Sequence, residues 1–103
     1  MKEVKIMKQN EFKILGRYHH NFIPDDNFGL GLFELFNFDN TKSYFTEIIF
    51  RNELVEKLKT FNEKQIVCIV GHIESFGDLV ADHIYTKGSK WFFILKGGGY
   101  MVH

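Results

Sequence analysis

Residues 42–71, KSYFTEIIFRNELVEKLKTFNEKQIVCIVG, place a short helical pattern between two strand-like segments. Residues 41–50 are rich in β-branched and aromatic side chains, as strands are. Apolar side chains then recur at the spacing of one helix face, at Leu54, Val55, Leu58 and Phe61. Residues 65–73 give a second strand pattern, apolar on both faces. The stretch therefore predicts a strand, a short helix and another strand.

The predicted helix has a recognisable first turn. Asn52 is a suitable N-cap residue, and Glu53 is placed to favour the helix dipole and to pair with Lys57 four residues later. A single helix between two strands of a β-rich chain predicts a small barrel with the helix covering its interior. That is the arrangement of an OB-fold, an all-β five-stranded Greek-key barrel with one helix between strands 3 and 4.

Further strand patterns lie on both sides of this stretch. The first two strands are predicted at residues 11–20 and 28–38, with a turn at residues 24–27 between them. Another strand is predicted at residues 79–86. Residues 91–96, WFFILK, are predicted to close the barrel.

Length and composition bound the class of protein. The chain has 103 residues, 45% of them hydrophobic, so we expect one domain with a single modest core. Residues 1–10 and 97–103 are expected to be a short arm and a flexible exit of this domain. The single cysteine, Cys68, cannot form an intrachain disulfide, and no apolar run approaches the ~18 residues of a membrane span. A cytoplasmic location without a membrane partner is therefore expected.

The formal net charge of zero argues against a strong polyanion binder, because contacts between phosphates and Lys or Arg dominate nucleic-acid affinity. The charges are nevertheless segregated along the chain. Residues 1–20 are mainly basic, residues 25–56 are mainly acidic, and basic residues prevail again from Lys57 onward. A basic groove on a neutral protein is compatible with this distribution.

The strand at residues 41–50 carries more large apolar side chains than one barrel face can bury. Because side chains alternate along a strand, Phe45 and Ile49 face opposite to Phe50, and both faces hold large groups. We expect the surplus to form an exposed patch, whose predicted members are Phe36, Phe38, Tyr44, Ile48 and Phe50. Such a patch is either a subunit interface or helix cover, or a platform on which unpaired bases stack. The two interpretations can coexist.

Two runs of sequence resemble one family. The run at residues 44–75 and the earlier run FKILGRYHHNFIP at residues 12–24 are similar in order and spacing to the bacterial single-stranded-DNA-binding proteins (SSB). Residues 29–38 fit the family's second strand, so the resemblance covers residues 12–96. It implies an OB-fold, a homodimer or homotetramer, and sequence-independent binding of single-stranded DNA in replication, repair or recombination. The family's acidic tail has no counterpart here, so recruitment of partner proteins by such a tail is not expected.

Residue types and the resemblance together give a set of candidate binding residues. The cations expected to follow the nucleic-acid backbone are Lys13, Arg17, Arg51, Lys87 and Lys90. The aromatic side chains expected to stack on bases are Phe36, Phe38, Tyr44, Phe50 and Trp91. By the resemblance, Tyr44 and Phe50 match positions of aromatic residues in the family's third strand. The family's hairpin tryptophan has no counterpart near Asp78, and Phe76 or Trp91 would replace it only in a differently shaped hairpin.

No catalytic or metal-binding pattern accompanies these residues. The five histidines lack the spacing of a zinc site, and no nucleophile, base and oxyanion site come together, so we expect a non-enzyme without metal or cofactor. The main hypothesis is single-stranded DNA binding. One alternative is an OB-fold protein-interaction module of the primosome type, which the zero net charge favours. The other is an RNA-binding module, which these residue types do not distinguish from a DNA-binding one.

Overall fold

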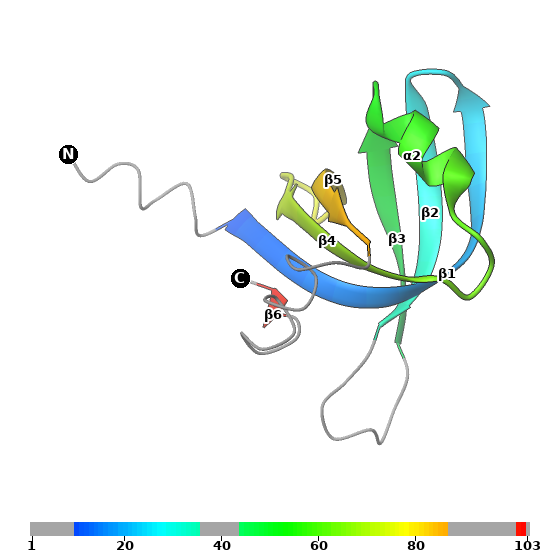
Figure 1. Ribbon diagram of the computed structural model, residues 1–103. Helices are drawn as coiled ribbons and strands as arrows, with labels where there is room; N and C mark the ends of the chain where they lie inside the picture. Colours follow the sequence, from blue (N-terminus) through cyan, green and yellow to red (C-terminus); the bar gives the residue numbers. More distant parts are fainter. Residues whose placement is uncertain (1–9, 36–43, 87–100, 103) are drawn as a thin grey trace.

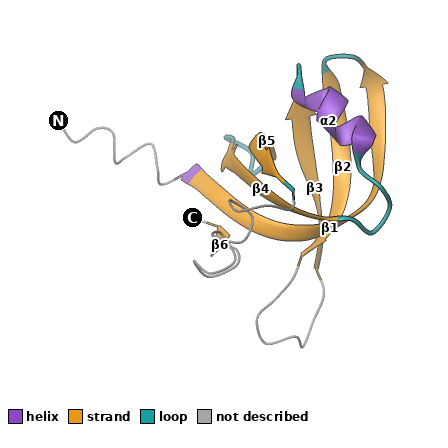
Figure 2. Ribbon diagram, in the orientation of Figure 1, coloured by secondary structure: helices purple, strands orange, loops and turns teal. Residues whose placement is uncertain are grey.

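The described part of the chain folds as a small closed β-barrel with one α-helix (Figures 1 and 2). A computed structural model describes residues 10–35, 44–86 and 101–102. Its elements, in chain order, are β1 (Glu11–Asp25), β2 (Phe28–Leu35), β3 (Tyr44–Arg51), α2 (Leu54–Thr60), β4 (Ile66–Ile73), β5 (Leu79–Tyr85) and β6 (Met101–Val102). The helix lies between the third and fourth strands, as the sequence predicts.

The barrel closes because β1 pairs with strands on both of its edges. The strand order is β2-β3-β5-β4-β1-β6, and β1 also pairs with β2. The first half of β1 runs antiparallel to β4, and its second half, from Gly16 onward, runs antiparallel to β2. β3 and β5 pair in parallel, with Ile48 opposite Leu79 and Ile49 opposite Val80. These pairings confirm the predicted OB-fold.

Gly71 permits the tightest approach between strands. A Cβ atom at this position would overlap the carbonyl oxygen of Val80 and lie 2.8 Å from the ring of Phe12. The register of β4 against β5 shifts between Val70 and Gly71. Glycine is therefore required where β4 bends around the barrel, because any side chain would displace the β5 backbone.

Aromatic rings fill the interior beneath the helix. Phe33 and Phe50 are fully buried with their ring centroids 6.0 Å apart, and the ring of Phe61 lies 6.2 Å from each of them. Val55 and Leu58 of α2 are also fully buried, and the helix contacts β1, β2 and β3. The predicted apolar face of the helix is confirmed. It covers the core at the end of the barrel where these three strands meet (Figure 2).

The helix begins differently from the predicted start. Asn52 has a left-handed backbone conformation, with φ of 55°, and Glu53 occupies the N-cap position without a side-chain capping hydrogen bond. The carbonyl oxygen of Asn52 accepts a hydrogen bond of 3.0 Å from the N–H of Val55. The predicted capping role of Asn52 is therefore wrong. The residue instead forms the turn from β3 into α2, where asparagine tolerates a left-handed backbone better than most residues.

The first strand is longer than predicted. β1 continues past His20 to Asp25, and its register against β2 shifts between Tyr18 and His20 and again after Phe22. The turn is confined to residues 26–27. There the N–H of Asn27 donates a hydrogen bond of 2.7 Å to Oδ1 of Asp25. The bulges interrupt the alternation of apolar side chains, which is why the pattern ends early in the sequence.

The predicted strand at residues 79–86 is found as β5, over Leu79–Tyr85, which lies between β3 and β4 in the barrel. Residues 91–96, which are predicted to close the barrel, lie outside the described part of the chain, so that expectation stays a prediction. Of the expected exit, residues 101–102 form β6, which pairs with β1.

Candidate functional site

The outward side chains of β1, β2 and β3 form one surface, which we call the outer face. Strand register brings them into three rows, each crossing β1, β2 and β3 in that order. The rows are Arg17, Glu34 and Phe45; His20, Leu32 and Glu47; and Phe22, Leu30 and Ile49. Of the side chains that alternate with them, Phe33 and Ile48 point into the barrel and are fully buried.

Two exposed phenylalanines stand at opposite corners of the outer face. Phe45 on β3 is 54% exposed and Phe22 on β1 is 64% exposed. The half-buried side chains of Leu30 and Leu32 lie between them on β2. The outer face therefore presents an apolar surface with an accessible aromatic ring at each end.

Polar groups gather beside Phe45. Its ring meets the ring of His19 edge-on, with the centroids 5.0 Å apart. Nε2 of His19 lies 3.3 Å from Oε1 of Glu34, and Nη1 of Arg17 lies 3.5 Å from the same oxygen. Glu34 thus holds two nitrogen-bearing side chains next to the ring, at the β1 side of the outer face.

A groove borders the other side of the outer face. It has a volume of about 360 Å³ and lies between the β2–β3 surface and the turn from β4 to β5. Its lining comprises Leu30, Thr46, Glu47, Ile49, Gly77, Asp78 and Leu79. Phe76, in the same turn, is 94% exposed. The lining of the groove therefore combines apolar residues, Leu30, Ile49 and Leu79, with two acidic ones, Glu47 and Asp78.

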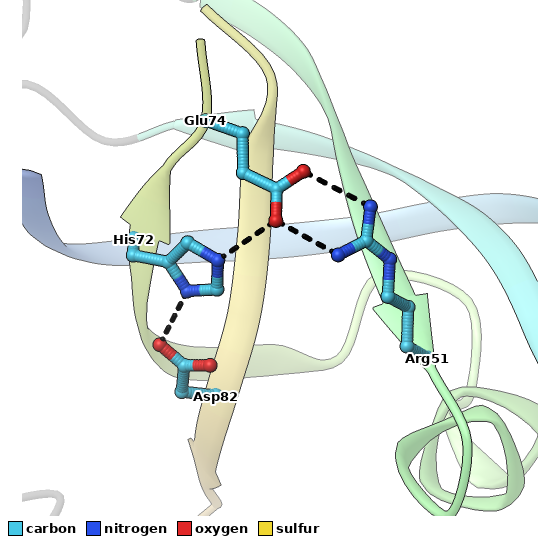
Figure 3. A network of polar contacts seen from close by, with 4 residues as sticks. All are labelled: Arg51, His72, Glu74 and Asp82. Atoms are coloured by element: carbon cyan, nitrogen blue, oxygen red, sulfur yellow. Dashed lines mark hydrogen bonds and ion pairs between the residues drawn. The ribbon is translucent and has the colours of Figure 1, made fainter.

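A network of charged side chains lies at the end of β3 and β4 (Figure 3). The guanidinium of Arg51 donates two hydrogen bonds to the carboxylate of Glu74, of 2.8 and 3.0 Å. The ring of His72 lies between two acids, with Nε2 3.1 Å from Glu74 and Nδ1 2.8 Å from Asp82. A second cavity of about 330 Å³ adjoins this network and is lined by Arg51, His72 and Asp82 among others.

These contacts change the acidity of the groups involved. Hydrogen bonds from Arg51 and then His72 lower the pKa of Glu74 from 4.5 to about 2. The hydrogen bond to Asp82, followed by that to Glu74, raises the pKa of His72 above 6.5. The hydrogen bond to Glu74 also raises the pKa of Arg51. The network therefore favours the ionised form of all three residues.

The predicted stacking residues have different environments in the structure. Phe50 is fully buried against Phe33, so its prediction as an exposed stacking ring is wrong, and Ile48 is buried with it. The helix packs on this side of β3, which turns Phe45 and Ile49 outward instead. Tyr44 is 50% exposed at the start of β3, and its stacking role stays a prediction. The predicted aromatic residues outside the described part of the chain are Phe36, Phe38 and Trp91.

The three predicted cations among the described residues lie in different surroundings. Arg17 lies on the outer face, beside Glu34. Lys13 lies opposite Val70 on the part of β1 that pairs with β4. Arg51 is bound to Glu74 at the far end of β3, which leaves its charge largely balanced. Lys87 and Lys90 lie outside the described residues.

Sequence reasoning passed over two residues of the outer face. The prediction that Phe50 is exposed implies that Phe45 faces inward, and the alternation alone gives no sign of which set faces the helix. Phe22 follows the bulge of β1, beyond the predicted end of that strand. An expectation that β1 of a small barrel runs long enough to pair with two neighbours would have placed Phe22 correctly.

Other chemistry is limited in residues 10–35 and 44–86. No group of three or more His, Cys, Asp or Glu side chains in these ranges could hold a metal ion. Cys68 is buried, and burial raises the pKa of its thiol from 9.0 to about 11, so the nucleophilic thiolate is disfavoured. In the part of the chain that the structure describes, no helix has the length and apolar character needed to cross a membrane.

Comparison with known proteins gives a match in structure alone. No protein-family model matches the chain, and no curated protein sequence does so either. Among solved structures, the SSB domain of a protein from Synechococcus sp. superposes with a TM-score of 0.61 over 74% of this chain and 93% of that one, at 8% sequence identity. The fold class is therefore an SSB-like OB-fold. This agrees with the resemblance seen in residues 12–96.

Proposed function

We propose that the protein binds single-stranded nucleic acid across its outer face. The observation that carries the proposal is the pair of exposed rings, Phe22 and Phe45, at the two ends of a half-buried apolar surface on β1, β2 and β3. Every base has a flat apolar face, so such rings bind bases with little regard to sequence. OB-folds bind oligonucleotides on this part of the barrel and on the adjoining loops.

The charges of the outer face favour one orientation of the strand. Arg17 and His19 lie on the β1 side, whereas Glu47 and Asp78 line the groove on the β3 side. Phosphates would be attracted to the first side and repelled from the second. The backbone of the nucleic acid therefore follows the β1 side, and the bases point across the apolar surface toward the groove.

The affinity in this arrangement comes mainly from stacking. Few cations of the described residues lie where phosphates would pass, and Arg17 also contacts Glu34. One or two neutralised phosphates would give a salt slope of about −1 in a plot of log affinity against log salt concentration. From the resemblance to SSB we further propose that the nucleic acid is single-stranded DNA and that the protein acts in the cytoplasm in replication, repair or recombination. The resemblance also favours a homodimer or homotetramer. We propose a binding protein, not an enzyme.

A specific observation supports a second candidate. The groove is lined by both acidic and apolar residues, Glu47 and Asp78 among the acidic ones, and the chain has no net charge. An apolar surface with acidic borders is suited to a protein segment with basic flanks, since opposite charges at the rim of an interface attract. This is the protein-interaction module that the composition left open.

Fluorescence anisotropy of labelled oligonucleotides tests the proposal. Oligo-dT, oligo-U and duplex DNA are titrated with the protein at low and moderate salt. We expect saturable binding of the single strands, weak binding of the duplex and a shallow dependence on salt. The variants Phe22→Ala and Phe45→Ala should each lose affinity, whereas Lys57→Ala, an exposed residue of α2, serves as the control. No saturable binding to any single strand would overturn the proposal and favour the protein-interaction module.

A further inference from the structure

Glu74 connects the turn between β4 and β5, through its backbone, with β3 and β4, through its side chain. Its N–H donates a hydrogen bond of 2.9 Å to the carbonyl oxygen of Asp78, and its carbonyl oxygen accepts one of 2.8 Å from the N–H of Gly77. Its side chain is held by Arg51 at the end of β3 and by His72 within β4. The position of the turn therefore depends on the partners of this one carboxylate.

The turn in question is also one wall of the groove. Gly77 and Asp78 line the groove, and Phe76, next to them, is almost fully exposed. Gly77 has a positive φ of 87°, which few other residues adopt, so the turn has one preferred shape. A change in how Glu74 is held would move Phe76 and Asp78 relative to the outer face.

The contacts of His72 need both of its ring nitrogens to carry a proton. Each nitrogen faces a carboxylate, Asp82 at 2.8 Å and Glu74 at 3.1 Å, and ionised carboxylates only accept hydrogen bonds. The neutral ring has one N–H and one lone pair. In that form one of the two carboxylates would face the lone pair, and the contact would become repulsive (Figure 3).

The surroundings of His72 are mostly acidic. From β5 it meets Asp82, and from the end of β4 it meets Glu74, which also binds the cation Arg51 of β3. Glu11 is its register partner on β1, and the adjoining cavity is bordered by Glu53. Asp78, in the turn, acts on Arg51. Of these carboxylates, Asp82 and Glu74 contact His72 directly, and their hydrogen bonds raise its pKa above 6.5.

We propose that His72 is a titratable positioning residue, which in its protonated form holds the β4–β5 turn against the groove and in its neutral form lets the turn move. The proposal rests on the proposed function for its consequence, namely that nucleic-acid affinity falls as His72 loses its proton. Because the pair with Arg51 keeps Glu74 attached, the turn shifts and does not unfold.

Two measurements on the whole protein test this inference. The first follows the amide NMR signals of Phe76 and Gly77 from about pH 5 to about pH 8, the range in which histidine titrates. The second measures oligo-dT affinity over the same range. Both are made on the unmodified protein, on His72→Gln, which cannot become charged, and on the control His83→Gln, an exposed histidine of β5 outside the network.

We expect the signals of Phe76 and Gly77 to titrate in the unmodified protein and in His83→Gln, and to stay constant in His72→Gln. The affinity should fall by about two- to fivefold across the titration, as befits an exposed charged contact, with this step absent from His72→Gln. His19 and His20 on the outer face are present in all three proteins, so the difference between the profiles isolates His72.

The outcomes separate this inference from the proposed function. Turn signals that titrate equally in His72→Gln would overturn the inference, whatever the affinity does. Signals that depend on His72 in a protein that binds no single strand would support the positioning role and contradict the proposed function. If the signals depend on His72 but the affinity profiles coincide, the turn does not contribute to binding and the regulatory part of the inference fails.

Discussion

Arg51 and Glu74 form a two-pronged ion pair, with Nη1 2.8 Å from Oε2 and Nη2 3.0 Å from Oε1, that joins the end of β3 to the end of β4. It spans the part of the barrel where backbone pairing is shortest, because β3 and β5 share only the pairs at Ile48 and Ile49. A bidentate arginine–carboxylate pair is the kind of exposed ion pair that does contribute to stability. We infer that these side chains help to close the barrel.

Replacing Glu74 by Gln should lower the melting temperature and change its dependence on acid. The pKa of Glu74 is about 2 in the folded protein against 4.5 for the ordinary group, so its stabilising effect is present above pH 4.5 and is lost as pH falls toward 2. Thermal melts followed by circular dichroism over this range should show a steeper acid loss for the unmodified protein than for Glu74→Gln. Parallel acid profiles would show that the pair contributes nothing to folding.

The contribution of His72 to stability should change with pH in the opposite direction. Its contacts raise the pKa of His72 above 6.5, so the stabilisation is present in full below pH 6.5 and is lost as pH rises through the raised value. Because the side chain is 39% exposed, we expect an effect of only about 0.5–1 kcal/mol in the free energy of unfolding. Urea titrations of the unmodified protein and His72→Gln should differ at mildly acidic pH and converge at alkaline pH. A constant difference across pH would contradict this.

The sequence predicts much of the fold because its strongest patterns are local. The helix face of Val55, Leu58 and Phe61 and the apolar strand that follows are both found, since each depends on neighbouring residues alone. The choice of which face of β3 turns inward does not depend on neighbouring residues alone. It is decided by packing of Phe50 against Phe33 and Phe61, residues far apart in the chain, and both faces of the strand are apolar enough to serve.

The candidate site is harder to predict for the same reason. The outer face depends on the register of three strands and on a bulge after Tyr18, neither of which leaves a regular pattern. The network joins Arg51 to Glu74 across 23 positions of sequence, and His72 to Asp82 across 10. Charged residues at such separations come together only once the barrel has closed.

Leu58→Ala tests how the helix is attached to the barrel. Leu58 is fully buried, and a Cβ atom added at Gly29 or Gly31 of β2 would come within 2.9 or 3.0 Å of its methyl groups. The close fit leaves little room for the structure to fill the cavity, so we expect a loss of about 2–5 kcal/mol in the free energy of unfolding. Chemical denaturation measures it, with Lys57→Ala as the exposed control on the same helix. A loss no larger than that of the control would contradict the packing of α2.

Phe45→Ala and Phe50→Ala should have opposite consequences, although the two residues lie in one strand. Phe45 is exposed on the outer face, so its removal should weaken single-strand binding by about 1–3 kcal/mol and leave the melting temperature nearly unchanged. Phe50 is fully buried, so its removal should cost about 3–5 kcal/mol of stability. Tyr44→Ala tests the sequence-based prediction of a second stacking ring, which is half-exposed on the side of β3 opposite to Phe45.

Anisotropy titrations and thermal melts of the same preparations separate these two effects. Unchanged affinity in both Phe45→Ala and Tyr44→Ala would remove base stacking on β3 from the proposed function. A stable Phe50→Ala protein would contradict the assignment of the inward face.

Glu47→Gln distinguishes the two candidate functions most directly. Glu47 lines the groove and is exposed on the outer face, where in the proposed function its carboxylate would repel the phosphates of a bound strand. The glutamine has nearly the same shape without the charge, so the affinity for oligo-dT should rise by about two- to fivefold at low salt and converge with that of the unmodified protein at high salt. Glu63→Gln removes the same charge from the turn between α2 and β4 and controls for net charge. If Glu63→Gln raises the affinity as much as Glu47→Gln, the strand does not pass the groove; if neither does, the acidic border of the groove is better explained by a protein partner with basic flanks.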